Sequence, residues 1–286
     1  MTQLPPTEPA DKAPLAEQTS PPAPNRAAGE MSLLDHLEEL RGVLIRSLAV
    51  LVVGCCIAGA LFTEISQALQ YPLKVALDTD DPEVVKGFLR TFSPYAVFSL
   101  FLQIIVYGGA ALASPFILYF IGTFLVPALN PNEKRILLPG ILAGTLLFIA
   151  GAAFAFFVVQ PLALEVSFKF NELAGTSENW GALDYYGGVI LLTLGMGAGF
   201  EFPLLLVILQ YLGVLTPDQL KRGWRWALLV ILIFSAILTP ADILSMVIAA
   251  IPLSLLYVGS IVVGSWVVKA KAKRDAAYWA DEDEAR

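Results

Sequence analysis

The chain has little charge for its length. Only 15% of its 286 residues are Asp, Glu, Lys or Arg, whereas 57% are hydrophobic. Soluble domains carry about 25% charged residues. The composition therefore excludes an ordinary soluble protein and indicates a membrane protein with several spans. The net charge of −7 comes largely from the tails and outer loops, and we expect no nucleic-acid partner.

Residue types that carry catalysis are also scarce. There is one histidine, His36, and the two cysteines, Cys55 and Cys56, are adjacent within the first apolar stretch. That spacing fits neither a zinc site nor a redox motif, and neighbouring cysteines rarely form a disulfide. No nucleophile elbow, zinc-protease motif, phosphate-binding loop or intramembrane aspartate pair is present. We expect no enzyme activity, no cofactor and no metal.

Six apolar stretches are long enough, or nearly long enough, to cross a membrane, which takes about 20 helical residues. They cover residues 42–63, part of 95–129, 136–164, 185–213, 226–241 and 243–268. The fifth is short, because only 16 residues separate Arg225 from Asp242. We expect a Pro-rich disordered tail at 1–30, a membrane domain at 31–268 and a charged tail at 269–286.

Basic residues indicate the orientation of the spans. With both termini in the cytoplasm, the inner segments hold 14 of the 18 lysines and arginines. The outer segments then hold only Lys74, Lys86, Arg90 and Lys169. Since positive residues concentrate on the cytoplasmic side, both ends are predicted to be cytoplasmic.

Glu201 is the only charged residue between Asp184 and Asp218. A carboxylate near the middle of a span costs several kcal/mol unless it faces a partner or a wet cavity, so such residues usually serve function. Gly195 and Gly199 form a small-residue face where another helix can approach closely. The alternative is a structural hydrogen bond from Glu201 to a neighbouring helix.

Two acids in the predicted inner segments, Glu39 and Glu133, are candidates for function. Glu39 belongs to a helix expected to begin near Ser32, in which Leu33, Leu37, Leu40 and Leu44 form an apolar stripe and the charged residues face water. A helix lying on the inner membrane surface, with solvated charges, is the alternative. Glu133 follows the second span and is either a functional acid or a helix N-terminal acid opening the third.

Taken together, the motifs resemble those of the TatC family, the large membrane subunit of the twin-arginine protein translocase. They follow the family order and cover about residues 31–266. The matching segments are His36-Leu-Glu-Glu-Leu-Arg41, Ser93-Pro94, Phe124-Leu-Val-Pro-Ala-Leu with Glu133-Lys-Arg135, Phe154-Ala-Phe-Phe-Val-Val-Gln-Pro161, Gly199-Phe-Glu201-Phe-Pro203, Leu238-Thr-Pro-Ala-Asp242 and Ala250-Ile-Pro252.

The resemblance implies an all-α membrane protein of six transmembrane helices in a concave, glove-shaped bundle with cytoplasmic termini. It implies a signal-peptide receptor in the cytoplasmic (inner) membrane that self-associates, contacts lipid, organises the single-span proteins TatA and TatB and works on the proton-motive force. The residues that match the family's signal-peptide site are Glu39, Arg41, Leu44, Phe124 and Glu133. Those that match its intramembrane partner contacts are Glu201, Thr239 and Asp242.

Some positions depart from the family pattern. Ala241 stands where a second proline is frequent, and Met246 where glutamine is common. In the family that glutamine belongs to a polar cluster that contacts partner helices, so these departures bear on partner docking at residues 239–246. A proton-coupled small-solute transporter, with Glu201 carrying the proton, is the alternative function. It would show inverted repeats with broken helices in both halves.

Overall fold

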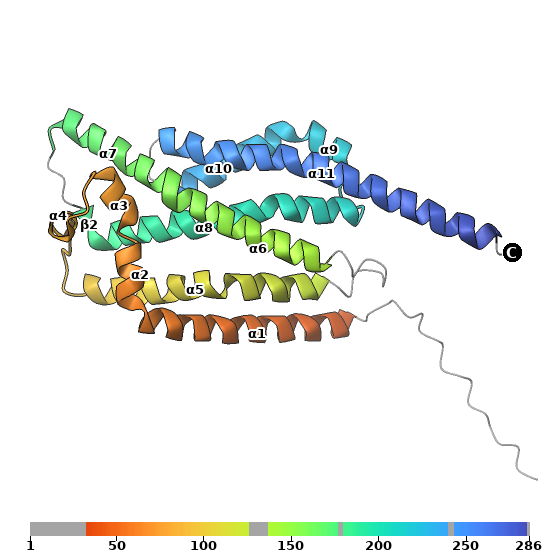
Figure 1. Ribbon diagram of the computed structural model, residues 1–286, viewed down its shortest axis with the longest axis horizontal. Coiled ribbons are helices and arrows are strands. Elements are labelled where there is room, and N and C mark those ends of the chain that lie inside the picture. The colour runs from red at the N-terminus through yellow and green to blue at the C-terminus, as the bar shows by residue number, and fades with distance from the viewer. Residues whose placement is uncertain (1–32, 126–136, 177–179, 240–242, 285–286) are drawn as a thin grey trace, which may run out of the picture.

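Long apolar helices dominate the computed structural model (Figure 1), which describes residues 33–125, 137–176, 180–239 and 243–284. Five stretches are long and apolar enough to cross a membrane: Leu37–Ala60, Ala96–Phe124, Pro139–Ala174, Ala182–Tyr211 and Ile243–Lys273. They belong to helices α1 (Leu33–Ala60), α5 (Ala96–Leu125), α6 (Leu137–Phe154) with its continuation, α8 (Ala182–Tyr211) and α11 (Ile243–Glu284). The shorter α10 (Trp224–Leu238) is the sixth apolar helix.

Successive long helices run in alternating directions (Figure 1), so α1 begins and α11 ends at the same end of the bundle. We call this the inner end and the opposite one the outer end. Leu125, at the end of α5, and Leu137, at the start of α6, are also at the inner end. The order of the expected spans is thus confirmed, and five of the six are long enough to cross a membrane, with α10 the shorter sixth helix.

Helices α1 and α5 meet backbone to backbone. A Cβ placed at Gly54 would lie 2.5 Å from the carbonyl oxygen of Gly109, and one at Gly109 would lie 2.6 Å from the backbone nitrogen of Cys55. Only glycine permits such an approach, the usual way in which helices pack in lipid. Cys55 and Cys56 are both free, as the sequence predicted.

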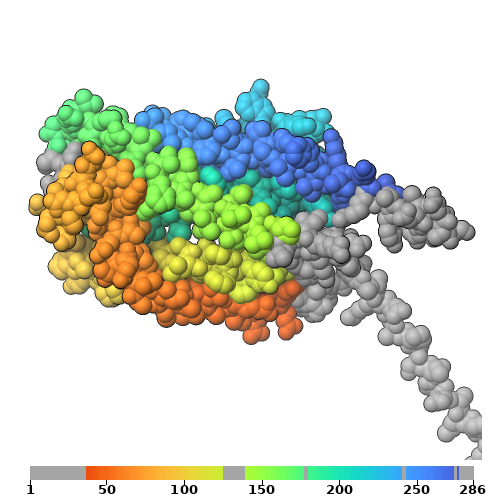
Figure 2. All heavy atoms as spheres, in the orientation of Figure 1, coloured from red at the N-terminus to blue at the C-terminus, as the bar shows by residue number. Residues whose placement is uncertain are grey.

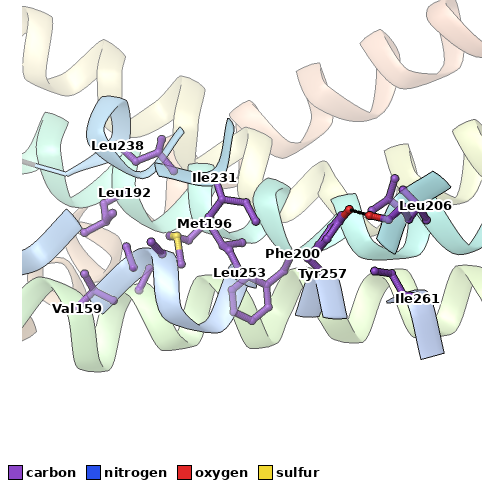
Figure 3. Close-up of a cluster of buried hydrophobic side chains, with 14 residues drawn as sticks. Val159, Leu192, Met196, Phe200, Leu206, Ile231, Leu238, Leu253, Tyr257 and Ile261 are labelled. Atoms are coloured by element: carbon purple, nitrogen blue, oxygen red, sulfur yellow. Dashed lines mark hydrogen bonds between the residues drawn. The ribbon is translucent and has the colours of Figure 1, made fainter. Parts of the chain in front are cut away.

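Helix α8 is the centre of the bundle, and its glycines receive side chains from three neighbours. Phe148 of α6 packs against Gly197, Leu238 of α10 against Gly195, and Phe234 of α10 with Leu253 of α11 against Gly199. The predicted close-approach face at Gly195 and Gly199 is therefore confirmed. Figure 3 shows the resulting apolar core, in which Tyr257 donates a hydrogen bond of 2.8 Å to the carbonyl of Leu220.

Short elements close the outer end of the bundle, and two of them, α2 (Phe62–Ala68) and α3 (Tyr71–Ala76), cover part of the face seen in Figure 2. The others are α4 (Pro82–Phe88), strand β1 (Leu89–Arg90) and strand β2 (Trp180–Gly181). The strands pair in parallel and join two outer loops that are distant in sequence. Tyr185 of α8 donates to the carbonyl of Leu69 at 2.8 Å, which fastens this cap to the bundle. The sequence had not indicated the strand pair.

The span lengths were predicted well at the fifth helix and poorly at the third and sixth. Helix α10 has 15 residues, the expected short span. The third continues past Phe154 through a π-helical turn, η3 (Ala155–Val159), into α7 (Gln160–Ala174). Helix α11 runs unbroken for 42 residues, so the described part of the charged tail, up to Glu284, extends that helix. Helix α9 (Pro217–Arg222) lies between the fourth and fifth spans, α8 and α10.

Helix α5 passes through Pro115 without interruption. Proline lacks an N–H and so deprives the carbonyl four residues earlier of its helix hydrogen bond. That carbonyl belongs to Ala111, and the hydroxyl of Ser114 donates to it at 2.7 Å. Such side-chain rescue is how membrane helices tolerate proline.

We predict that Gly54→Ala lowers the stability of the protein by about 1–3 kcal/mol, because the new methyl forces two backbones apart. Thermal unfolding in detergent measures the effect. Gly59→Ala in the same helix is the control, since its Cβ would meet only the Ile105 side chain, at 3.5 Å. An equal loss for both variants would contradict the assigned role of the Gly54–Gly109 contact.

Candidate functional sites

Glu39 lies in the second turn of α1, on the side that packs against α5. Its helical neighbours Val43 and Gly54 along that side are buried. The side chain is half-buried, and its Oε2 has almost no contact with solvent and accepts no hydrogen bond within the described residues. At the inner end of the bundle, Glu39 thus has one carboxylate oxygen that no described residue bonds.

Phe124 lies at the same level as Glu39 on the neighbouring helix. The α1–α5 contact joins Gly54 to Gly109. Glu39 is 15 residues before Gly54, and Phe124 is 15 residues after Gly109. The two helices run antiparallel and side by side (Figure 1), so both residues are roughly 22 Å inward of the contact. The structure therefore brings Glu39 and Phe124 to one end of one helix pair.

Arg41 and Leu44 lie on the side of α1 that faces away from α5, so the structure does not bring them together with Glu39. The predicted apolar stripe points outward: Leu37, Leu40 and Leu44 are 59%, 45% and 68% exposed. Arg41 is exposed, as expected, whereas Glu39 lies on the packed side of the helix and is half-buried. The alternative of a separate surface helix is wrong, because residues 33–60 form one continuous helix.

Glu133 lies outside the described residues. The segment 126–136 that contains it joins α5 to α6, and the flanking Leu125 and Leu137 both belong to the inner end. Its proximity to Glu39 therefore stays a prediction.

Glu201 faces α6. A Cβ placed at Gly144 of α6 would lie 2.9 Å from Glu201 Oε2 and 3.0 Å from a methyl of Leu204, so the glycine makes room for the carboxylate. Oε1 is buried and has no hydrogen-bond partner within the described residues. The side chain as a whole is half-buried, while the adjacent Phe202 is 44% exposed. An intramembrane acid thus lies at the edge of the α6–α8 contact, partly accessible from outside.

Thr239 is not part of the same site. It is buried at the end of α10, and its hydroxyl donates to the carbonyl of Ser235 at 2.9 Å. The preceding Leu238 packs on Gly195, six residues outward of Glu201 and on a different side of α8. Asp242, predicted as a third partner contact, lies outside the described residues.

Two buried glutamines and a half-buried one were missed by the sequence reasoning. In each, the amide oxygen lacks a hydrogen-bond partner within the described residues: Gln103, Gln160 and Gln210. Gln210 is otherwise well held, since its Nε2 donates to the carbonyls of Leu206 and Ser260 at 3.2 and 3.0 Å. An uncharged amide hardly lowers the hydropathy of a span, but an amide inside an apolar run is the signal that would have found them.

The described residues hold no group of three or more His, Cys, Asp or Glu side chains that suits a metal ion. What the geometry offers instead is two carboxylates with unpaired oxygens, Glu39 at the inner end and Glu201 within the membrane. Such groups bind cationic or hydrogen-bonding side chains of other molecules.

Comparison with known proteins decides the family. The model of the family described as Sec-independent protein translocase protein (TatC) matches residues 35–252. The chain belongs to the TatC family. The TatC protein of Xylanimonas cellulosilytica is 34% identical over 96% of this chain and 98% of its own. That of Aquifex aeolicus is 36% identical over 84% of this chain and 98% of its own.

Two crystal structures of the twin-arginine translocase receptor TatC are similar to this fold, each with a TM-score of 0.70. They are 34% and 36% identical in sequence and match over 81% and 80% of this chain and 99% of their own. The all-α membrane fold predicted from the sequence is confirmed. This TatC-family chain is a multi-pass protein of the cytoplasmic (inner) membrane and a component of a Sec-independent protein translocase.

We predict that Glu201→Met raises the thermal stability of the isolated TatC chain in detergent, because a buried acceptor without a partner costs about 1–3 kcal/mol. Gln210→Met is the matched change in the same helix. It should lower stability by a similar amount, since it removes two hydrogen bonds. Unfolding temperatures of the two variants should therefore move in opposite directions, and a loss of stability in Glu201→Met would show that its carboxylate is satisfied.

Proposed function

We propose that this chain is the receptor and scaffold subunit of a twin-arginine translocase. It binds the Arg-Arg signal peptide of folded precursor proteins at the cytoplasmic face and organises TatA and TatB for export driven by the proton-motive force. The observation that carries the proposal is the buried Oε2 of Glu39, which has no hydrogen-bond partner within the described residues. It lies level with Phe124 at the inner end of the α1–α5 pair.

The chemistry of two acids explains a requirement for two arginines. In the proposed site Glu39 and Glu133 each accept a pair of hydrogen bonds from one guanidinium group, in the planar fork geometry that lysine does not supply. Phe124 offers an apolar surface beside them for the hydrophobic part of the signal. Arg41 and Leu44, on the outward side of α1, contact the signal only where it wraps around that helix.

Glu201 is the proposed contact for a partner's transmembrane helix. Its Oε1 is buried and accepts no hydrogen bond from a described residue, and Phe202 beside it is 44% exposed. A polar group on an incoming helix can therefore reach the carboxyl. In lipid such a bond satisfies both groups at once. Thr239 and Asp242 belong to a separate contact at the α10–α11 turn, where the departures at Ala241 and Met246 also lie.

The small-solute transporter is not favoured. In an inverted repeat the second span of each half would correspond, which pairs α5 with α10. Helix α5 has 30 residues and α10 has only 15. The halves therefore do not match in the way that such transporters require.

Glu39→Ala is predicted to weaken binding of an Arg-Arg signal peptide by about tenfold or more, the effect of losing a charge-assisted hydrogen-bond pair. Glu133→Ala should do the same, and binding to the purified protein is measured by fluorescence anisotropy. Glu38→Ala is the control, because Glu38 is exposed and lies on another side of the helix. A Lys-Lys peptide should bind wild type as weakly as Arg-Arg binds the variants. Retained binding in the Glu39→Ala, Glu133→Ala double variant would refute the site.

Glu201→Ala is predicted to leave signal-peptide binding unchanged while reducing co-purification of TatA and TatB and the export of a reporter precursor. The reason is that residue 201 lies in the membrane, away from the inner end. Glu172→Ala, at an exposed outer position, is the control. Normal export and normal partner recovery in Glu201→Ala would remove the role proposed for this acid.

A further inference from the structure

A cavity of about 630 Å³ lies at the outer end of the bundle, away from both proposed sites. One wall is a single side of α7, along which Gln160, Leu164, Ser167 and Asn171 recur at helical spacing. The first two turns of α8 form the opposite wall, and β2 closes the cavity above them. The volume suits a small molecule or a lipid headgroup.

A buried acceptor without a donor lies in this cavity. Gln160 is only 3% exposed, and its Oε1 has no hydrogen-bond partner within the described residues. A buried amide oxygen left unpaired is costly. A ligand that donates a hydrogen bond removes that cost.

The charge of the cavity selects the ligand. Among the described residues that line it, Asp184 is the only charged one. It lies in the first turn of α8, where the helix dipole favours a carboxylate. Phe92, Phe170 and Trp180 add aromatic rings, and aromatic faces attract cations. Acceptors with a carboxylate and aromatic rings favour an alkylammonium group, which has N–H donors and no acceptor.

A donor for an anion is present as well. Asn171 lines the cavity, and its Oδ1 already accepts a hydrogen bond from Thr176 at 3.2 Å. Its amide N–H₂ is the part that remains to donate, and a phosphate oxygen accepts such bonds well. A zwitterionic lipid headgroup carries both an ammonium group and a phosphate group.

The depth of the cavity matches the headgroup layer. Gln160 is 23 residues beyond Leu137, the start of α6, which amounts to roughly 35 Å of helix against a hydrocarbon core of about 30 Å. Gly188 forms the inward edge, where an added Cβ would meet nothing within 4 Å. One turn further inward Leu191 is 51% exposed, an apolar surface along which an acyl chain can lie.

We propose that this cavity binds the headgroup of an ethanolamine phospholipid of the outer leaflet. The ammonium donates to Gln160 Oε1 and to the Asp184 carboxylate between the aromatic rings, and the phosphate accepts from Asn171. The lipid rather than a free amine is the occupant, because the cavity lies at headgroup depth and its inward edge continues to the exposed Leu191.

The test is native mass spectrometry of the full chain in detergent, with phosphatidylethanolamine, phosphatidylcholine and phosphatidylglycerol titrated separately. The ethanolamine lipid should bind about tenfold more tightly than the other two, since N-methylation removes the N–H donors and the glycerol headgroup has no cation. A soluble tri-alanine peptide, which also carries a primary ammonium group, should not displace it. Equal binding of all three lipids, or displacement by the peptide, would overturn the proposal.

Two variants locate the binding. Gly188→Leu should fill the cavity and abolish the preference for phosphatidylethanolamine without disturbing the fold. Gly259→Leu in α11, another helical glycine with open space, should keep that preference. Asp184→Asn should weaken the binding of phosphatidylethanolamine about tenfold. Asp80→Asn, at an exposed position, should leave that binding unchanged. Wild-type lipid preference in both Gly188→Leu and Asp184→Asn would place the lipid elsewhere and sink the assignment.

Discussion

Backbone-to-backbone contact between helices is the constraint on which this bundle depends. Lipid is as apolar as leucine, so burying leucine between helices gains little, and close packing must supply the stability. Gly54 with Gly109 joins α1 to α5, and Gly151 admits Phe200 and the carbonyl of Met196 to join α6 to α8. The same closeness makes polar side chains informative. Glu201, for example, is packed beside Gly144, yet the described residues do not supply hydrogen bonds to both of its carboxylate oxygens.

The sequence predicted the spans well because charge and hydropathy mark a membrane directly. It also predicted the contact face of α8 from Gly195 and Gly199, since small residues at this spacing have a specific meaning in lipid. At the start of α1 the sequence showed the leucine stripe but not which side of the helix packs against the protein, and the structure leaves the described leucines of that stripe exposed. In water an apolar stripe is the packed side of a helix. In a membrane the lipid-facing side is apolar too, so periodicity alone does not tell which side faces the protein.

The outer cap was missed for a different reason. Strands of two residues have no periodic pattern, and pairing Leu89 with Trp180 joins positions that are far apart in the sequence. The stacked rings of Phe168 and Trp180, whose centroids are 4.8 Å apart, hold that junction. Aromatic residues in outer loops look like ordinary interfacial anchors until the fold brings them together. The cavity beside β2 was equally invisible, because its walls come from three elements.

Under the proposed function, α5 is the element that both sites share. It packs along α1, which presents Glu39, and it also contacts α6 and α8, between which Glu201 lies. A signal peptide held at Glu39 and Phe124 touches the inner end of α5, and a helix docked at Glu201 borders its middle. Coupling between sites requires an element with two arrangements, not mere adjacency. Pro115 interrupts the backbone hydrogen bonding of α5, and the Ser114 hydroxyl replaces the missing bond there. A side-chain hydrogen bond is exchanged more readily than a backbone one, so this turn is where α5 can bend at the least cost.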